Sequence, residues 1–152
     1  MVTRKKGVFS TLIVLIVLQF IQPTQNKSGY LLATDITNIY AVPDSVEKIL
    51  KTACYDCHSD NTHYPLYAYV QPLGWVLNNH IRQGKKNLNF SEFGSYSKQK
   101  QKSKFRSIAS QIDEGAMPVS SYTLMHKNAR LTNKLKSLLI QWAQQSKIAS
   151  EK

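Results

Sequence analysis

Apolar residues recur at helical spacing in four separate stretches of the chain, and nowhere do they alternate over a useful length. The first stretch has apolar residues at i, i+3, i+4 and i+7, namely Val46, Ile49, Leu50 and Ala53. The preceding segment from Asp44 to Glu47 fits a capping box, and Pro43 stands directly before it. The pattern therefore predicts a helix that begins at Asp44 and runs into Cys54.

Three later stretches repeat this spacing and predict three more helices. Pro72, Ser97 and Thr132 are their expected starts, and Gly84 and Gly115 are the expected ends of the first two. The positions expected to face inward are Leu73, Val76, Leu77 and His80, then Phe105, Ile108, Ala109 and Ile112, then Leu135, Leu138, Leu139 and Trp142. The fold class is therefore all-α, a domain of about four helices joined by long loops.

The N-terminus carries a hydrophobic leader. Arg4, Lys5 and Lys6 precede an apolar run from Val8 to Ile21 that is short for a membrane span and typical of a secretory signal. We therefore expect export. Because no small-residue cleavage site follows the apolar run, we favour an N-terminal anchor over a cleaved signal peptide. Residues 23–40 are polar and mixed, and we expect a linker there.

The chain has two cysteines, and both stand in the sequence ACYDCH at positions 53–58. Cys54, Cys57 and His58 form the C-x-x-C-H pattern of c-type haem attachment. Two thiols three residues apart on one helical turn can each join a haem vinyl group, and the following imidazole then points at the iron. The alternatives are a disulfide or a redox dithiol, whereas a zinc site lacks two further ligands at suitable spacing.

A second axial ligand is expected on the opposite haem face. Met117 is favoured because it lies in a loop between two predicted helices, because Pro118 restricts its backbone, and because it follows His58 by 59 residues. His80 is the principal rival, and Met125 is more typical of a packing residue. We expect His63 to lie on the surface of the attachment loop and His126 to be structural or exposed.

The ordered motifs carry a family resemblance over about Tyr40 to Ala143. The sequences CYDCHSDNTHYPLYAYVQP, LNFSEF, AMPVSSYTLMHKNARLT and LIQWA resemble the haem-binding domain family of small exported bacterial proteins, and the arrangement is similar to class I c-type cytochromes. The resemblance implies thioether sites at Cys54 and Cys57, His58 as the proximal ligand and Met117 as the distal ligand. It also implies that the N-terminal helix of the domain packs across the C-terminal helix, with Trp142 near Ile49 or Leu50.

These patterns divide the chain into four regions. They are a signal peptide or N-terminal membrane anchor at 1–22, a linker at 23–40, a cytochrome c-like haem-binding domain at 41–146 and a tail at 147–152. One covalent haem c is the expected cofactor. Further candidates for the haem pocket are His80, Trp75, Tyr64 and Pro118.

The expected function is one-electron transfer in the periplasm or at the inner membrane, because two protein ligands leave no position for a substrate. An enzyme or gas sensor would need an open or displaceable sixth position, with His80 as its acid or base. A dithiol oxidoreductase would need a βαβ pattern around the cysteines, which is absent. The chain is thus more typical of an electron carrier than of a catalyst.

The charge is strongly basic, with 20 Lys and Arg against 9 Asp and Glu. The lysines are scattered, and no nucleic-acid motif accompanies them, so we exclude nucleic acid as a partner. We expect acidic redox proteins as partners, contact with the membrane through the N-terminal segment, and a monomer.

Overall fold

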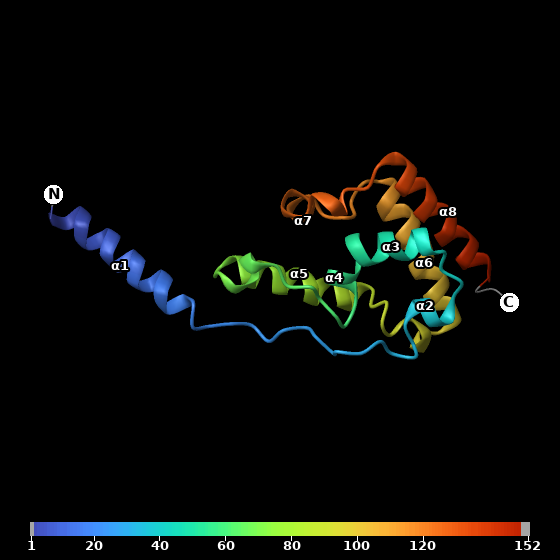
Figure 1. Ribbon diagram of the computed structural model, residues 1–152, viewed down its shortest axis with the longest axis horizontal. Helices are drawn as coiled ribbons and strands as arrows, with labels where there is room; N and C mark the ends of the chain where they lie inside the picture. Colours follow the sequence, from blue (N-terminus) through green and yellow to red (C-terminus); the bar gives the residue numbers. More distant parts are fainter. Residues whose placement is uncertain (1, 150–152) are drawn as a thin grey trace.

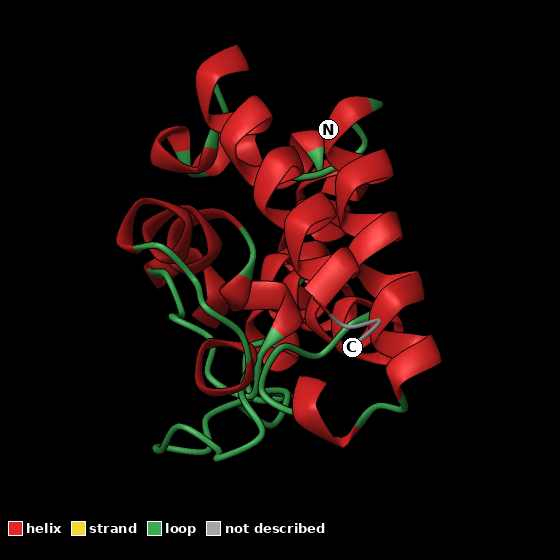
Figure 2. Ribbon diagram, turned by 90° about the vertical axis from the view of Figure 1, so that its right-hand side faces the viewer, coloured by secondary structure: helices red, strands yellow, loops and turns green. Residues whose placement is uncertain are grey.

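The computed structural model describes residues 2–149, with side chains from Lys5 onward, and within that part it contains helices and loops apart from one isolated bridge between Lys27 and Asn61 (Figures 1 and 2). The side chain of Arg4 and residues 150–152 of the expected tail lie outside the described residues. The all-α prediction is confirmed. The α-helices are α1 (Val2–Leu18), α2 (Ile36–Ile39), α3 (Asp44–Ala53), α4 (Tyr55–His58), α5 (Leu73–Asn87), α6 (Lys98–Asp113), α7 (Ser120–Met125) and α8 (Asn133–Ala149). Three 3₁₀ helices interrupt the loops, η1 (Leu66–Tyr69), η2 (Phe93–Ser95) and η3 (Lys127–Ala129).

The long helices α6 and α8 lie side by side at one end of the molecule, and α3 packs against α8 (Figure 1). Phe105 of α6 meets Trp142 of α8 edge to face, with ring centroids 5.7 Å apart. The indole Nε1 of Trp142 donates a hydrogen bond to the carbonyl oxygen of Ala41, 3.2 Å away. Trp142 shares one buried cluster with Ile49 and Leu50, as the expected crossing of the first and last domain helices requires.

Helix ends follow the expected chemistry at α6 and α8. The Ser97 hydroxyl accepts from the Lys100 backbone N–H at 3.3 Å, and the Thr132 hydroxyl accepts from that of Leu135 at 3.4 Å. Gly115 ends α6 with a positive φ of 70°, a conformation that costs glycine nothing and other residues about 1 kcal/mol. These three assignments are confirmed.

The capping box predicted at Asp44 is wrong by one residue. Pro43 is the N-cap of α3, and its carbonyl accepts from the N–H groups of Val46 and Glu47. Asp44 therefore lies within the first turn, where its carboxylate still favours the positive end of the helix dipole. Glu47 instead pairs with Lys51 one turn later, at 2.5 Å.

Helix α5 buries only part of the face expected, because Leu77 is buried and His80 half-buried but the other two positions are exposed. Leu73 and Val76 are 48 % and 52 % exposed, whereas Gly74, Leu77, Ile81 and Gly84 are buried. Gly84 does not end the helix, which continues to Asn87. A Cβ at Gly84 would lie 2.3 Å from the Cys57 carbonyl oxygen, so the absence of a side chain lets α5 pack directly on α4.

The segment 23–40, expected to be a linker, lies along the domain. The Asp35 carboxylate caps α2, accepting from the Thr37 backbone N–H at 3.0 Å and from the Tyr55 hydroxyl at 2.9 Å. Ile36 is completely buried in the main cluster. This segment therefore contributes to the same core as α3, α6 and α8.

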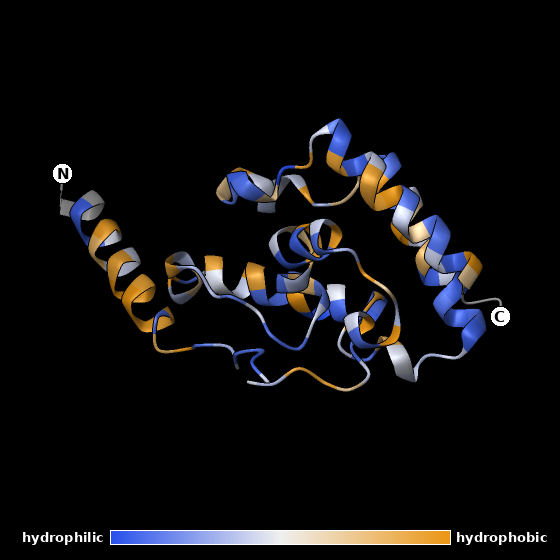
Figure 3. Cartoon of the chain, turned by 45° about the vertical axis from the view of Figure 1, so that its right-hand side comes forward, coloured by the Kyte–Doolittle hydropathy of each residue, from blue (hydrophilic) through white to orange (hydrophobic). Residues whose placement is uncertain are grey.

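In Figure 3, most of the length of α1 is orange, the colour of hydrophobic residues. In the described part of the chain, no helix combines the length and the apolar character that crossing a membrane requires.

Candidate functional site

The attachment turn, which we define as Cys54 to His58, follows α3 without a loop. The Cys54 N–H still donates to the Leu50 carbonyl of α3 at 2.9 Å. The Cys54 carbonyl accepts from the N–H groups of Cys57 at 3.1 Å and His58 at 3.0 Å, which closes the short helix α4. Both thiols and the imidazole are thereby carried on a single helical turn.

The two cysteines are free thiols in apolar surroundings. Cys54 packs against the main cluster and against a second one formed by Ala53, Tyr122 and Ala129. Cys57 packs against a third, formed by Ala68, Leu77 and Ile81. Burial, with the nearby Cys57, raises the pKa of the Cys54 thiol to about 12, and burial, with the nearby Asp56, raises the pKa of the Cys57 thiol to about 11. Redox dithiols have lowered thiol pKa values, so this environment does not suit a dithiol oxidoreductase.

The His58 imidazole is oriented by the main chain of the segment that follows α5. Its Nδ1 lies 3.0 Å from the Leu88 carbonyl oxygen. Since a carbonyl only accepts, Nδ1 carries the proton, and Nε2 keeps its lone pair for a metal. Burial lowers the pKa of His58, although hydrogen bonds to the carbonyls of Leu88 and Gly84 oppose this. The neutral imidazole with a free Nε2 is the form that coordinates iron.

Asp56 ties the attachment turn to α7 on the other side of the site. Its carboxylate accepts from the Tyr122 hydroxyl at 2.6 Å and from the His63 backbone N–H at 2.9 Å, and its carbonyl accepts from the Thr62 hydroxyl at 2.6 Å. His63 itself is exposed, as expected. The sequence reasoning missed the link to Tyr122, and the only signal for it was an acidic residue between the two cysteines.

The candidate distal ligand Met117 lies, as expected, in the loop between α6 and α7. It is half-buried and packs against the main cluster, which Cys54 also contacts. Its N–H donates to the Gln111 carbonyl at 3.1 Å, directly after the turn at Gly115. Pro118 follows it and is also half-buried. Met125, expected to be a packing residue, is instead 56 % exposed at the end of α7.

The remaining candidates lie around α5 and η1. His80 is half-buried and shares one side of α5 with the exposed Leu73 and Val76, seven and four residues earlier. The Trp75 Nε1 donates to the Ile21 carbonyl at 2.9 Å. The Tyr64 hydroxyl accepts from the Asn26 N–H at 2.7 Å, and its ring packs in the cluster that contains Cys57. Trp75 and Tyr64 thus hold the N-terminal segment.

His126 packs between the two sides of the site. Its ring stacks on Tyr122 with centroids 4.1 Å apart and lies 5.8 Å from the ring of Tyr67 in η1. The rings therefore connect α7 to η1, close to the link between Tyr122 and Asp56.

These residues fit the requirements of a covalently held porphyrin: two reduced thiols on one turn, a neutral imidazole with a free Nε2, apolar surroundings, and a thioether in a loop that packs on the same cluster as Cys54. A family model described as a haem-binding domain matches residues 13–145. No curated protein and no solved structure matches the chain.

Proposed function

The chain belongs to the haem-binding domain family, and we propose that it holds one haem covalently through Cys54 and Cys57 and carries single electrons in the cell envelope. The observation that carries this proposal is the His58 imidazole, held by the Leu88 carbonyl on the same turn as the two thiols. Haem binding follows from the family. The covalent bond, the ligands and the electron-transfer role are the proposal.

Each residue of the site has a definite task in this proposal. Cys54 and Cys57 would hold the haem through thioether bonds, and His58, through Nε2, and Met117, through its thioether, would be the protein ligands of the iron. Bound haem supplies a one-electron couple between ferric and ferrous iron. The Met117 thioether would favour the ferrous state, and the hydrogen bond from His58 to the Leu88 carbonyl would fix the plane of the imidazole.

Electron transfer is favoured over catalysis because both axial positions would be filled by side chains of this chain. A carrier of this kind needs only an exposed edge and a partner, and the excess of Lys and Arg would steer acidic redox proteins toward it. We further propose export, with retention at the inner membrane through the N-terminal segment. The basic residues before the apolar run support this proposal, because such residues favour the cytoplasmic side of a membrane.

The first test compares absorption spectra of the purified ferric protein with those of Met117→Ala and Met125→Ala. Ligation by Met117 predicts a weak far-red sulfur-to-iron band that disappears in Met117→Ala and persists in Met125→Ala. A high-spin native spectrum, or a band lost only in Met125→Ala, would contradict this ligand assignment. A low-spin native spectrum without the band would point to His80, and His80→Ala would then become high-spin.

Covalent attachment is tested separately by haem staining after denaturing electrophoresis. The single variants Cys54→Ala and Cys57→Ala should retain less haem, and the double variant should retain none. Full staining of the double variant would refute covalent attachment through these cysteines.

A further inference from the structure

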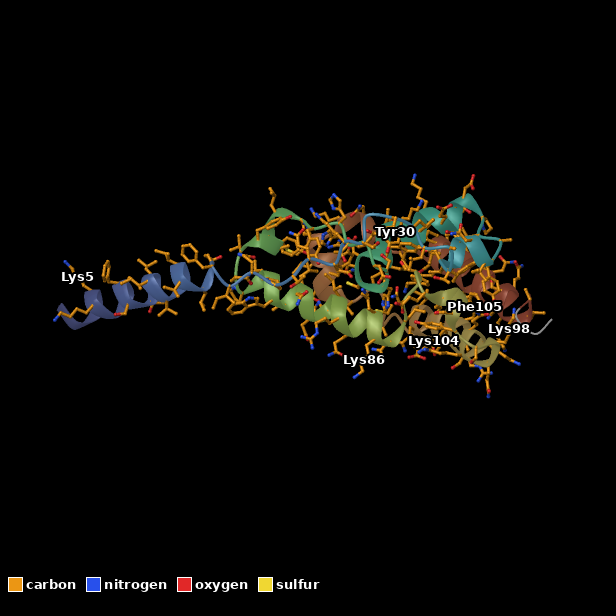
Figure 4. All side chains as sticks on the ribbon, turned by 90° about the horizontal axis from the view of Figure 1, so that it is seen from below. Lys5, Tyr30, Lys86, Lys98, Lys104 and Phe105 are labelled. Atoms are coloured by element: carbon orange, nitrogen blue, oxygen red, sulfur yellow. The ribbon has the colours of Figure 1, made fainter. Side chains whose placement is uncertain are left out.

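From Val8 onward, helix α1 carries apolar side chains on all sides, and no other element of the described chain covers it. Every large apolar side chain from Val8 to Val17 is at least 42 % exposed. In Figure 4, α1 extends away from the rest of the molecule, with Lys5 near its far end. A helix that is apolar all round is stable only in apolar surroundings, either a protein core or lipid.

The end of α1 is fastened to the domain by a set of hydrogen bonds that we call the glutamine clasp, formed by Gln19, Gln22 and Gln71. The Gln19 side chain accepts from the Gln71 N–H at 2.8 Å and donates to the Gln71 carbonyl at 3.2 Å. The Gln22 side chain accepts from the Gln71 side chain at 2.9 Å and donates to the Tyr69 carbonyl at 3.2 Å. The side chains of the two glutamines after the apolar helix thus form hydrogen bonds with main-chain groups of Tyr69 and Gln71, at and just after the end of η1.

The chain beyond the clasp stays bound to the domain. The Ile21 carbonyl accepts from the Trp75 indole, and the Asn26 side chain donates to the Ser59 carbonyl at 2.8 Å. The Ser28 N–H donates to the Asp60 carbonyl at 2.9 Å. The connection from α1 to the attachment turn is therefore a strap with fixed contacts, and it sets which edge of the domain lies nearest α1.

That edge carries exposed apolar side chains. Leu66 of η1 is 89 % exposed, and Tyr69 and Val70 beside the clasp are also exposed. We call Leu66, Tyr69 and Val70 the η1 edge. Figure 1 places η1 and the start of α5 at the end of the domain that faces α1. Tyr69 and Trp75 are residue types that favour the boundary between lipid and water.

We propose that the η1 edge rests on the lipid surface, held there by the glutamine clasp while α1 lies in the apolar layer. Lipid is the occupant because exposed apolar side chains continue beyond α1 at Phe20 and Ile21, within the clasp that binds the η1 edge, and because the exposed Lys5 and Lys6 at the far end of α1 suit anionic head groups. This inference rests on the proposed membrane retention and is independent of haem attachment. It assigns the clasp the role of orienting the attachment turn relative to the membrane.

The test uses the full chain in vesicles of phosphatidylethanolamine and phosphatidylglycerol. A photo-crosslinking benzophenone amino acid replaces Leu66, Val70 or, as a control, Ile148, which is 61 % exposed on α8 at the end of the molecule away from α1 (Figure 1). Lipid adducts should form at Leu66 and Val70 and be at least several-fold weaker at Ile148. Equal adducts at all three positions, or adducts to protein in place of lipid, would overturn the proposal.

The role of the clasp is tested in the same vesicles with the double variant Gln19→Leu and Gln22→Leu, which keeps α1 apolar. Losing these side-chain hydrogen bonds should reduce adducts at Leu66 and Val70 by about tenfold while the protein stays bound to the vesicles. Gln83→Leu, the same change at an exposed position of α5, should leave them unchanged. Unreduced adducts in the double variant would refute the clasp. Haem staining of each sample reports separately on the proposed function.

Discussion

The hydrogen bond between Tyr122 and Asp56 offers a direct test of how the attachment turn is held. Tyr122 is 8 % exposed, and its hydroxyl donates to a carboxylate oxygen at 2.6 Å. Hydrogen bonds to charged groups contribute about 1.5–3 kcal/mol, and the partial exposure of Asp56 favours the lower end of that range. Tyr122→Phe keeps the ring that stacks on His126, so it removes the hydrogen bond with little loss of packing.

Tyr122→Phe should therefore lower the free energy of unfolding by about 1.5–2 kcal/mol, a fall in Tm of roughly 3–8 °C. Thermal and denaturant unfolding followed by far-UV circular dichroism measure this. The control is Tyr30→Phe, which removes a hydroxyl from an exposed side chain. If both variants unfold like the wild type, the link between α4 and α7 contributes nothing to stability and the reasoning fails.

The same pair predicts a dependence on alkaline pH. Burial and then the hydrogen bond to Asp56 raise the pKa of Tyr122 above its ordinary value. The stability that the neutral hydroxyl contributes is therefore present below the unfolded pKa of about 10 and is lost as the pH rises through the folded value. The difference in unfolding free energy between wild type and Tyr122→Phe should therefore begin to shrink above about pH 10. A constant difference would show that the hydroxyl does not titrate as the contacts require.

Three other substitutions test the packing around the site by chemical denaturation. Gly84→Ala should lower the free energy of unfolding by about 2 kcal/mol, because the added Cβ meets a carbonyl oxygen of α4. The control Asn79→Ala, at an exposed position of the same helix, should leave that free energy unchanged or raise it by about 0.5 kcal/mol. Equal effects of the two variants would contradict the close approach of α5 to α4. Gly115→Ala should cost about 1 kcal/mol through its positive φ, and no loss would contradict that strain. Trp142→Phe should cost about 2 kcal/mol by removing a hydrogen bond and leaving a small void, so unchanged stability would refute its anchoring role.

The sequence predicted the helices whose buried faces consist of large apolar residues. For α6 and α8 the spacing, the capping hydroxyls and Gly115 all agreed, and the structure confirms them. For α5 the apolar residues fit two overlapping faces. The correct face includes two glycines, which an apolar pattern does not reveal because they are buried by close approach of main chains.

The candidate site was predicted only as far as its residues are neighbours in sequence. Cys54, Cys57 and His58 follow from one short motif, and the structure places them on one turn. The Leu88 carbonyl that orients His58 belongs to the main chain, 30 residues away, so no side-chain pattern identifies it. The link from Asp56 to Tyr122 spans 66 residues and depends on where α7 lies, which tertiary packing decides.

The packing of α3 on α8 requires the closure of a long loop of the chain. The hydrogen bond from Trp142 to Ala41 joins residues 101 positions apart, and closing a loop of that length costs roughly 4 kcal/mol in chain entropy. Ligation of one iron by His58 and Met117 would shorten the remaining loop to about 42 residues and lower that cost by roughly 0.8 kcal/mol. The cofactor would then act as an internal cross-link that brings the C-terminal helix to its place, and the chain without haem should fold more slowly than the chain that carries it.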